Sequence, residues 1–173
     1  MPAMPTRTLV LVRHAKSSWD LDVDDHDRPL SGRGRRDGVQ IGQDLTRKQI
    51  RPDLVLCSTA TRTRETWDRA LRGGVQAKEV RYVGTIYHGW VPELVRLLRE
   101  IPDSVGTALM LGHAPGIPDL VEFLAERDHA SADWDRMTAK FPTAGMAILS
   151  YPGSWADIGQ SQAELESFEV PRA

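Results

Sequence analysis

Short runs of consecutive apolar residues alternate along the chain with longer stretches in which apolar residues recur at helical spacing. Such short runs, rich in Val, Leu and Ile, are typical of buried strands, whereas the longer period is typical of amphipathic helices. The pattern predicts strands over residues 9–12, 54–57, 80–83, 107–112 and 146–151, and an edge strand over 164–170. It predicts helices over residues 32–50, 61–71, 92–101, 117–126 and 134–140. Because strands alternate with helices, the sequence predicts an α/β fold with a mostly parallel sheet and helices on both faces.

Residues that favour helix ends flank several of these stretches. Ser31 is expected to cap the first helix, because a serine hydroxyl accepts hydrogen bonds from the free amides of a first turn. Pro92 is compatible with the first turn of the third helix, where no amide hydrogen is needed. Gly32, Gly34 and Gly38 lower the helix propensity of the first helix, so that packing has to supply its stability.

The length and composition of the chain exclude several classes of protein. The 173 residues favour one domain, residues 1–173, with flexible ends over 1–6 and 171–173. A net charge of -2 gives no electrostatic support for nucleic-acid binding. No apolar stretch reaches the length of a membrane span, and no signal peptide is evident, so a cytoplasmic protein without a membrane partner is expected. The single cysteine, Cys57, excludes an intrachain disulfide and is expected to be a small buried residue.

Polar residues follow three of the predicted strands directly. The first strand ends in Arg13 and His14, the second is followed by Arg62 one turn into the next helix, and a later strand ends in Gly112 and His113. In open α/β sheets ligands bind beyond the carboxyl ends of parallel strands, which all lie at the same edge. The sequence therefore predicts that two arginines and two histidines converge on one pocket.

These residue types suit phosphoryl chemistry. Guanidinium groups of Arg13 and Arg62 can bind phosphate oxygens in pairs and stabilise the charge of the transition state. His14 has to be neutral to attack phosphorus, and the arginine charges beside it are expected to lower its pKa. Its other ring nitrogen is expected to bind a backbone carbonyl. His113 is expected to contribute a hydrogen bond, or a charge if protonated, to the phosphoryl group.

The chain resembles the histidine phosphatase superfamily, also called the phosphoglycerate-mutase-like fold. The resemblance rests on Arg13-His14, on Ser58-x-x-x-Arg62-x-x-x-Thr66 and on Gly112-His113. More narrowly the chain is similar to SixA-type phosphohistidine phosphatases. The narrower match rests on Arg13-His14-Ala15-Lys16, on residues 25–34 with their Asp-x-x-Arg-Pro-Leu-Ser-x-x-Gly pattern, and on Phe141-Pro142-Thr143.

The resemblance implies a three-layer α/β/α sandwich whose mostly parallel sheet has an antiparallel edge and which lacks a helical cap insertion. It also implies a phosphohistidine intermediate, no metal or other cofactor, and a catalytic core of four residues. These four are His14, Arg13, Arg62 and His113. Ser17, Arg28 and Ala114 are further expected substrate contacts, although Arg28 could instead anchor its loop to an acid.

One departure from the superfamily concerns the general acid. Many members have a Glu near the third strand, but residues 84–89, Gly-Thr-Ile-Tyr-His-Gly, contain none. Asp20 is a candidate replacement, because a carboxyl beside a bound phosphate has a raised pKa and can donate a proton. The competing interpretation leaves Asp20 in a solvated acidic loop. An imidazole leaves more readily than an alkoxide, so the missing Glu also fits a phosphoramidate substrate.

The leading hypothesis is a metal-independent phosphatase that acts through His14 on phosphohistidine of a partner protein. One alternative is a phosphatase of small phosphomonoesters, and an alternative of another class is a phospho-ligand binding module with weak or lost catalysis. His26, His88 and His129 show no metal-ligand spacing. Trp19 and Trp90 either line the pocket or pack at its rim.

Overall fold

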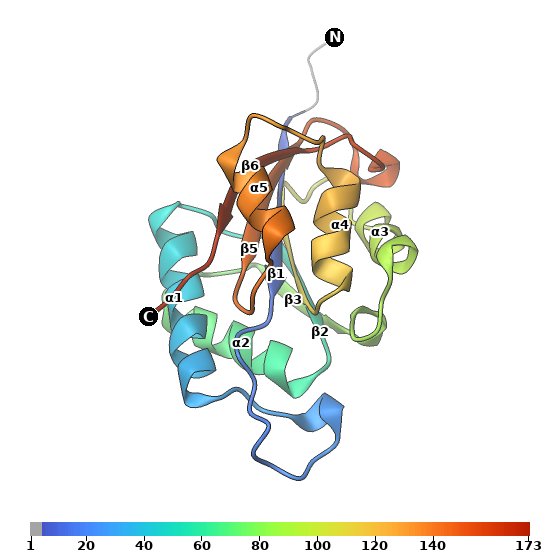
Figure 1. Ribbon diagram of the computed structural model, residues 1–173. Coiled ribbons are helices and arrows are strands. Elements are labelled where there is room, and N and C mark those ends of the chain that lie inside the picture. Colours follow the sequence, from blue (N-terminus) through green and yellow to red (C-terminus); the bar gives the residue numbers. More distant parts are fainter. Residues whose placement is uncertain (1–4) are drawn as a thin grey trace.

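The computed structural model describes residues 5–173, which form one six-stranded sheet with helices on both faces (Figure 1). The strands are β1 (Arg7–Arg13), β2 (Leu54–Ser58), β3 (Glu79–Val83), β4 (Thr107–Gly112), β5 (Met146–Tyr151) and β6 (Glu164–Glu169). The helices are α1 (Gly32–Arg47), α2 (Thr61–Arg72), α3 (Val91–Arg99), α4 (Gly116–Leu124) and α5 (Ala132–Ala139). Short 3-10 turns occupy Asp25–Asp27, Gly84–Ile86 and Trp155–Asp157.

The sheet has the order β3-β2-β4-β1-β5-β6. The first four of these strands are parallel, whereas β5 pairs antiparallel with both β1 and β6. The mixed α/β architecture expected from the family resemblance is therefore confirmed, with the antiparallel pairing confined to the β5–β6 side.

Side chains of the central strands alternate between two cores. Leu9 and Leu11 of β1 pack with α3, α4 and α5, whereas Val10 and Val12 pack with α1 and α2. This alternation is the period-two pattern of a strand buried on both faces. It sorts the helices into two outer layers, as Figure 1 shows for α1 and α2 on one side of the strands and α3 and α4 on the other.

The register of the parallel strands brings the candidate residues to one edge. Arg13 at the end of β1 is paired with Gly112 at the end of β4, and Cys57 near the end of β2 is paired with Leu111. The chain therefore leaves β1, β2 and β4 at the same level. The segments that follow these strands meet there, which is the arrangement the strand ends predicted.

All predicted helices and strands are present, and their ends differ by a few residues. Ser31 caps α1 as expected, since its hydroxyl accepts a hydrogen bond from Gly34 N. The prediction carried α1 to Ile50, but the helix ends at Arg47 because Gln49 adopts a left-handed φ of 59°. The amides of Gln49 and Ile50 turn back to the carbonyls of Thr46 and Leu45, which satisfies the end of the helix.

Gly34 and Gly42 of α1 allow close packing against neighbouring backbone. A Cβ on Gly42 would lie 1.9 Å from the carbonyl oxygen of Ala70 in α2, so the two helices touch backbone to backbone. A Cβ on Gly34 would lie 2.0 Å from the carbonyl oxygen of Lys16, two residues after His14. The absence of side chains at these positions therefore sets α1 against both α2 and the segment after β1.

The carboxyl end, which the sequence predicts to be flexible over 171–173, makes hydrogen bonds to α1. Asp37 of α1, which is 2% exposed, accepts hydrogen bonds from Arg172 Nη1 at 3.2 Å and from Ala173 N at 3.1 Å. Arg172 also donates to the carbonyl of Thr143. Of the other predicted flexible end, residues 1–4 lie outside the described part of the chain. Within residues 5–173, no helix has the length and apolar character needed to cross a bilayer.

Candidate active site

His14 lies at the point where β1 leaves the sheet, and hydrogen bonds fix its backbone on both sides. Its amide donates to Gly112 O at 3.0 Å, and its carbonyl accepts from Ala144 N at 2.9 Å. The side chain is fixed as well, because Nδ1 lies 2.7 Å from Ala15 O. A carbonyl only accepts, so Nδ1 of the neutral ring carries the hydrogen. Nε2 therefore keeps its lone pair, as a nucleophile requires.

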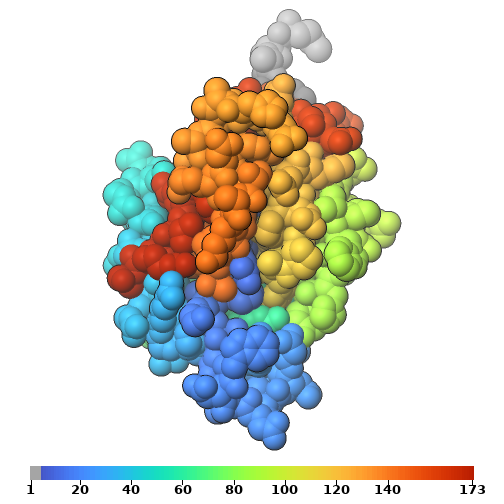
Figure 2. Space-filling view, viewed as in Figure 1, coloured from blue at the N-terminus to red at the C-terminus, as the bar shows by residue number. Residues whose placement is uncertain are grey.

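The four predicted core residues lie around one pocket of about 330 Å³, which we call the cationic pocket. Its lining residues are Arg13, His14, Lys16, Ser17, Trp19, Arg28, Arg62, His113, Ala114 and Thr143. The structure thus brings together residues from the ends of β1, β2 and β4. Figure 2 shows the loop after β1, in blue, as the lobe at the bottom of the view, with the teal β2–α2 junction visible above it.

Burial and positive charge keep both histidines neutral. The pKa of His14 falls from 6.5 to about 3, mainly because the ring is buried and further because Arg62, Arg13 and Arg28 lie nearby. The hydrogen bond to Ala15 acts in the opposite direction. The expected direction of the shift holds, although burial and not arginine charge is its largest cause. The pKa of His113 also falls to about 3, mainly through burial, then because two protonated histidine rings would repel each other and because Arg62 is charged.

Asp25 joins the arginines of the site, which the sequence analysis missed. Its backbone carbonyl and its carboxylate accept from Arg62 at 2.7 and 3.1 Å, and the carboxylate also accepts from Arg28 Nε at 3.0 Å. Tyr87 donates its hydroxyl hydrogen to the same carboxylate. The Tyr87 hydrogen bond, followed by those from Arg28 and Arg62, holds the pKa of Asp25 well below its ordinary value. Asp25 therefore remains ionised and aligns two guanidinium groups.

Arg28 was expected either to reach the pocket or to anchor its loop, and it does both. Its guanidinium lines the cationic pocket and binds Asp25, while Nη1 donates to Ser17 Oγ at 2.6 Å. The Trp19 ring covers it at 3.4 Å from the ring centroid. Ser17 and Ala114 also line the pocket, whereas Asp20 is exposed and is not among its lining residues. A general-acid role for Asp20 stays a prediction.

Side chains behind the pocket hold its walls in place. Thr66 accepts from Ala15 N at 3.0 Å and donates to Arg62 O at 2.7 Å, so it connects α2 to the segment after His14. Ser58 Oγ lies 2.7 Å from His113 Nε2. These contacts give a structural reason for the Ser58 and Thr66 positions of the Ser-x-x-x-Arg-x-x-x-Thr pattern.

Three nitrogen atoms of the four core residues are buried without a hydrogen-bond partner among residues 5–173. They are Arg13 Nε, Arg62 Nε and His113 Nδ1. Buried polar atoms are normally paired, and clusters of exceptions often mark a ligand site. These unpaired nitrogen atoms lie together at a site with three guanidinium groups, which is an arrangement suited to binding an anionic ligand. In the same described range, His, Cys, Asp and Glu side chains form no group of three that could hold a metal ion.

The sequence of this chain is similar to known proteins. Residues 9–81 match the model of the histidine phosphatase superfamily, branch 1. An uncharacterized protein, Rv1276c, of Mycobacterium tuberculosis is 38% identical over 164 residues, which cover 93% of this chain and 100% of that protein.

Two solved structures share both fold and sequence. A protein of Nakamurella multipartitia, named as a candidate phosphohistidine phosphatase SixA, is 37% identical with a TM-score of 0.88, covering 99% of this chain and 100% of that one. A protein named in the same way from Agrobacterium tumefaciens is 26% identical with a TM-score of 0.77, covering 95% and 99%. This chain belongs to the histidine phosphatase superfamily.

Proposed function

We propose that this protein is a metal-independent phosphatase that hydrolyses phosphohistidine on a partner protein through a phosphorylated His14. The observation that carries the proposal is the 2.7 Å contact of His14 Nδ1 with Ala15 O, which leaves Nε2 unprotonated beside three arginines. A neutral, oriented imidazole in a cationic pocket is suited to attack phosphorus.

The first step transfers the phosphoryl group to the protein. Nε2 of His14 attacks phosphorus, and a P–Nε2 bond forms while the bond between phosphorus and the leaving atom breaks. Arg13, Arg28 and Arg62 stabilise the charge on the three non-bridging oxygens. In the second step water attacks the same phosphorus atom. The P–Nε2 bond then breaks, inorganic phosphate leaves with the water oxygen, and His14 is neutral again.

A phosphohistidine substrate removes the need for an acidic side chain. When the far ring nitrogen of the substrate is protonated, the leaving imidazole departs as a neutral molecule. Donor and acceptor are then the same chemical group, so the transfer to His14 is close to thermoneutral. An alkoxide leaving group would need a proton, and residues 84–89 supply no carboxyl group for this purpose.

A protein-borne substrate is favoured by the surface beside the cationic pocket. The loop after β1 exposes three apolar side chains within five residues: Trp19, Leu21 and Val23 are 75%, 54% and 44% exposed. Trp19 also lines the pocket. Apolar side chains gathered at the mouth of a site are typical of surfaces that bind other proteins.

The proposal is tested with a protein domain phosphorylated on histidine. We expect release of inorganic phosphate in the presence of a metal chelator, and acid-labile labelling of His14 when the reaction is quenched early. His14→Ala should abolish both, whereas His129→Ala, which changes an exposed histidine, should abolish neither. Undiminished turnover by His14→Ala contradicts the mechanism. Faster turnover of small phosphomonoesters than of phosphohistidine would favour a metabolite phosphatase. Binding of the phosphorylated protein without turnover would favour a binding module.

A further inference from the structure

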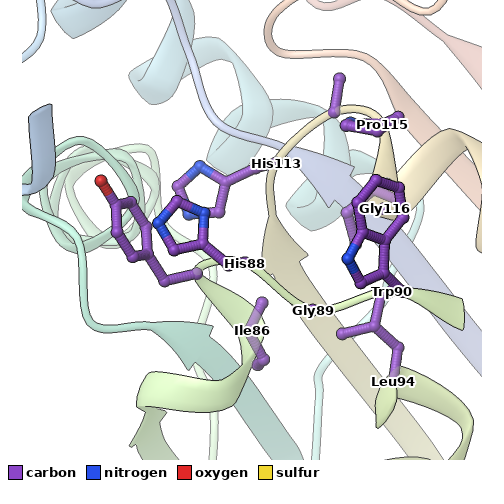
Figure 3. Close-up of a pocket in the computed structure, with 11 residues that line it drawn as sticks. Ile86, His88, Gly89, Trp90, Leu94, His113, Pro115 and Gly116 are labelled. Carbon is purple, nitrogen blue, oxygen red and sulfur yellow. The ribbon is translucent and has the colours of Figure 1, made fainter. Parts of the chain in front are cut away.

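A second pocket of about 330 Å³ adjoins the cationic pocket (Figure 3). It lies between the β3–α3 loop and the β4–α4 turn, and we call it the aromatic pocket. Its lining residues are Ile86, Tyr87, His88, Gly89, Trp90, Leu94, His113, Ala114, Pro115, Gly116 and Ile117. His113 and Ala114 line both pockets, so the two form neighbouring parts of one site.

The two pockets differ in chemistry. None of the residues lining the aromatic pocket is an aspartate, glutamate, lysine or arginine. Rings dominate it instead: Figure 3 shows His88 and His113 toward one side and the Trp90 indole toward the other. The rings of Tyr87 and His88 lie 3.9 Å apart between centroids. Aromatic walls without acidic side chains, lysine or arginine favour a planar apolar or heteroaromatic ring.

Close backbone packing shapes the aromatic pocket. A Cβ on Gly116 would lie 2.7 Å from the carbonyl oxygen of Gly89, and a Cβ on Gly89 would lie 2.8 Å from Leu94 Cδ2. The loop and the turn are therefore in direct contact at two glycines. The pocket consequently depends on a defined backbone arrangement, while the Trp90 side chain at its edge is 62% exposed.

The position of the aromatic pocket relative to His14 suggests its occupant. In an in-line displacement the leaving group departs on the side of phosphorus away from the nucleophile. His14 lines the cationic pocket and not the aromatic one, whereas His113 lies on the wall between them. When the arginines hold the phosphoryl group in the cationic pocket, its leaving group can therefore extend past His113 into the aromatic pocket.

We infer that the aromatic pocket binds the leaving group of the substrate, and that this group is a planar aromatic or heteroaromatic ring bonded directly to the phosphoryl group. The inference rests on the proposed function and specifies its substrate class. The imidazole of phosphohistidine belongs to this class. Trp90 is the specificity-determining residue, because its exposed indole can cover the ring without contacting the phosphoryl oxygens.

Two small phosphoramidates isolate the effect of the ring. Phosphoimidazole has an imidazole leaving group, whereas phosphoramidate itself has only ammonia and places nothing in the aromatic pocket. We expect Trp90→Ala to lower kcat/KM about tenfold for phosphoimidazole, the upper range for aromatic pairing, and to leave phosphoramidate turnover unchanged. Trp90→Phe should restore most of the loss. Tyr82→Ala is the matched control, because it removes a 42% exposed aromatic ring outside both pockets.

The outcomes separate the inference from the proposed function. If Trp90→Ala lowers turnover of both substrates equally, or of neither, the aromatic pocket does not select the leaving group. If the wild-type protein hydrolyses phosphoramidate with labelling of His14 but gains nothing from the ring of phosphoimidazole, the inference fails and the phosphatase stands. If it hydrolyses neither substrate, the inference fails. If it also leaves a protein domain phosphorylated on histidine intact, the proposed function is overturned as well.

Discussion

The cationic and aromatic pockets are neighbours, yet they are built in opposite ways. In the cationic pocket His14, Arg28, Arg62 and His113 are only 6–8% exposed, and Asp25, Ala15 and Ser58 hold these side chains in position. In the aromatic pocket the Trp90 side chain is largely exposed, and Gly89 and Gly116 pack closely against backbone and against Leu94. Phosphoryl transfer requires charged groups in fixed positions, whereas selection among leaving groups requires only a surface that matches the shape and polarity of the leaving group. Under the proposed function, catalysis takes place in the cationic pocket and the aromatic pocket selects the leaving group.

Arg62→Lys is expected to produce the largest effect, because it keeps the charge but removes the planar guanidinium that binds Asp25 and is proposed to bind phosphoryl oxygens. We expect kcat/KM for phosphoramidate to fall about 100-fold, similar to the loss of one preorganised donor in other enzymes. Arg64→Lys is the matched control, since Arg64 lies on the same helix but is exposed. Equal activities of the two variants would mean that the cationic pocket needs charge without fixed geometry.

Gly34→Ala tests whether backbone contact positions the segment after His14. The added Cβ would collide with Lys16 O, so we expect a loss of about 1–3 kcal/mol in the free energy of unfolding. Turnover should fall as well, because the Lys16 backbone has to move. Gly32→Ala is the control in the same turn: its Cβ would meet only the ends of two arginine side chains at 3.6 Å. Urea unfolding of both variants measures the difference, and similar stabilities would contradict the packing argument.

The pH dependence of stability tests the neutral state of the buried histidines. The unfolded chain takes up protons at His14 and His113 near pH 6.5, whereas the folded protein does so only near pH 3. Between these values the unfolded state binds more protons, so stability falls as the pH drops. Each histidine contributes up to about 1.4 kcal/mol per pH unit.

Urea unfolding at pH 7 and pH 5 provides the measurement. His14→Asn should reduce the dependence of unfolding free energy on pH, and the exposed control His129→Asn should not change it. Identical slopes for wild type and His14→Asn would show that His14 titrates normally. Under the proposed mechanism the lowered pKa also preserves activity, because His14 stays neutral as the solution becomes acidic.

The two pockets also differ in how far the sequence predicts them. Arg13, His14, Arg62 and His113 follow strands of a parallel sheet, and strand position follows from the apolar pattern, so their convergence was predictable. The Asp25 network was not, because it depends on the 3-10 turn Asp25–Asp27, whose shape has no periodic signal. The Asp-x-x-Arg pattern at 25–28 was the one available indication.

The sequence predicts the aromatic pocket less well than the cationic pocket. Its walls come from a loop and a turn that touch at Gly89 and Gly116, and a close backbone contact between distant glycines leaves no pattern along the chain. The sequence indicates His88 only as a histidine without metal-ligand spacing, and Trp90 only as a residue of the pocket or its rim. The sequence therefore predicts side chains placed by strands better than sites formed where irregular segments meet.

Tyr87→Phe is expected to change kcat/KM least among these substitutions. It tests a residue that contributes to both pockets. Its ring lines the aromatic pocket, while its hydroxyl donates to Asp25, which aligns Arg28 and Arg62. Phenylalanine keeps the ring and removes this one hydrogen bond, of about 1 kcal/mol, so we expect kcat/KM to fall about fivefold. The loss should be equal for phosphoimidazole and phosphoramidate, because the change acts on the arginines and not on the leaving group. If kcat/KM falls for phosphoimidazole alone, the Tyr87 hydroxyl acts on the leaving group in the aromatic pocket. The two pockets would then not have separate roles at this residue.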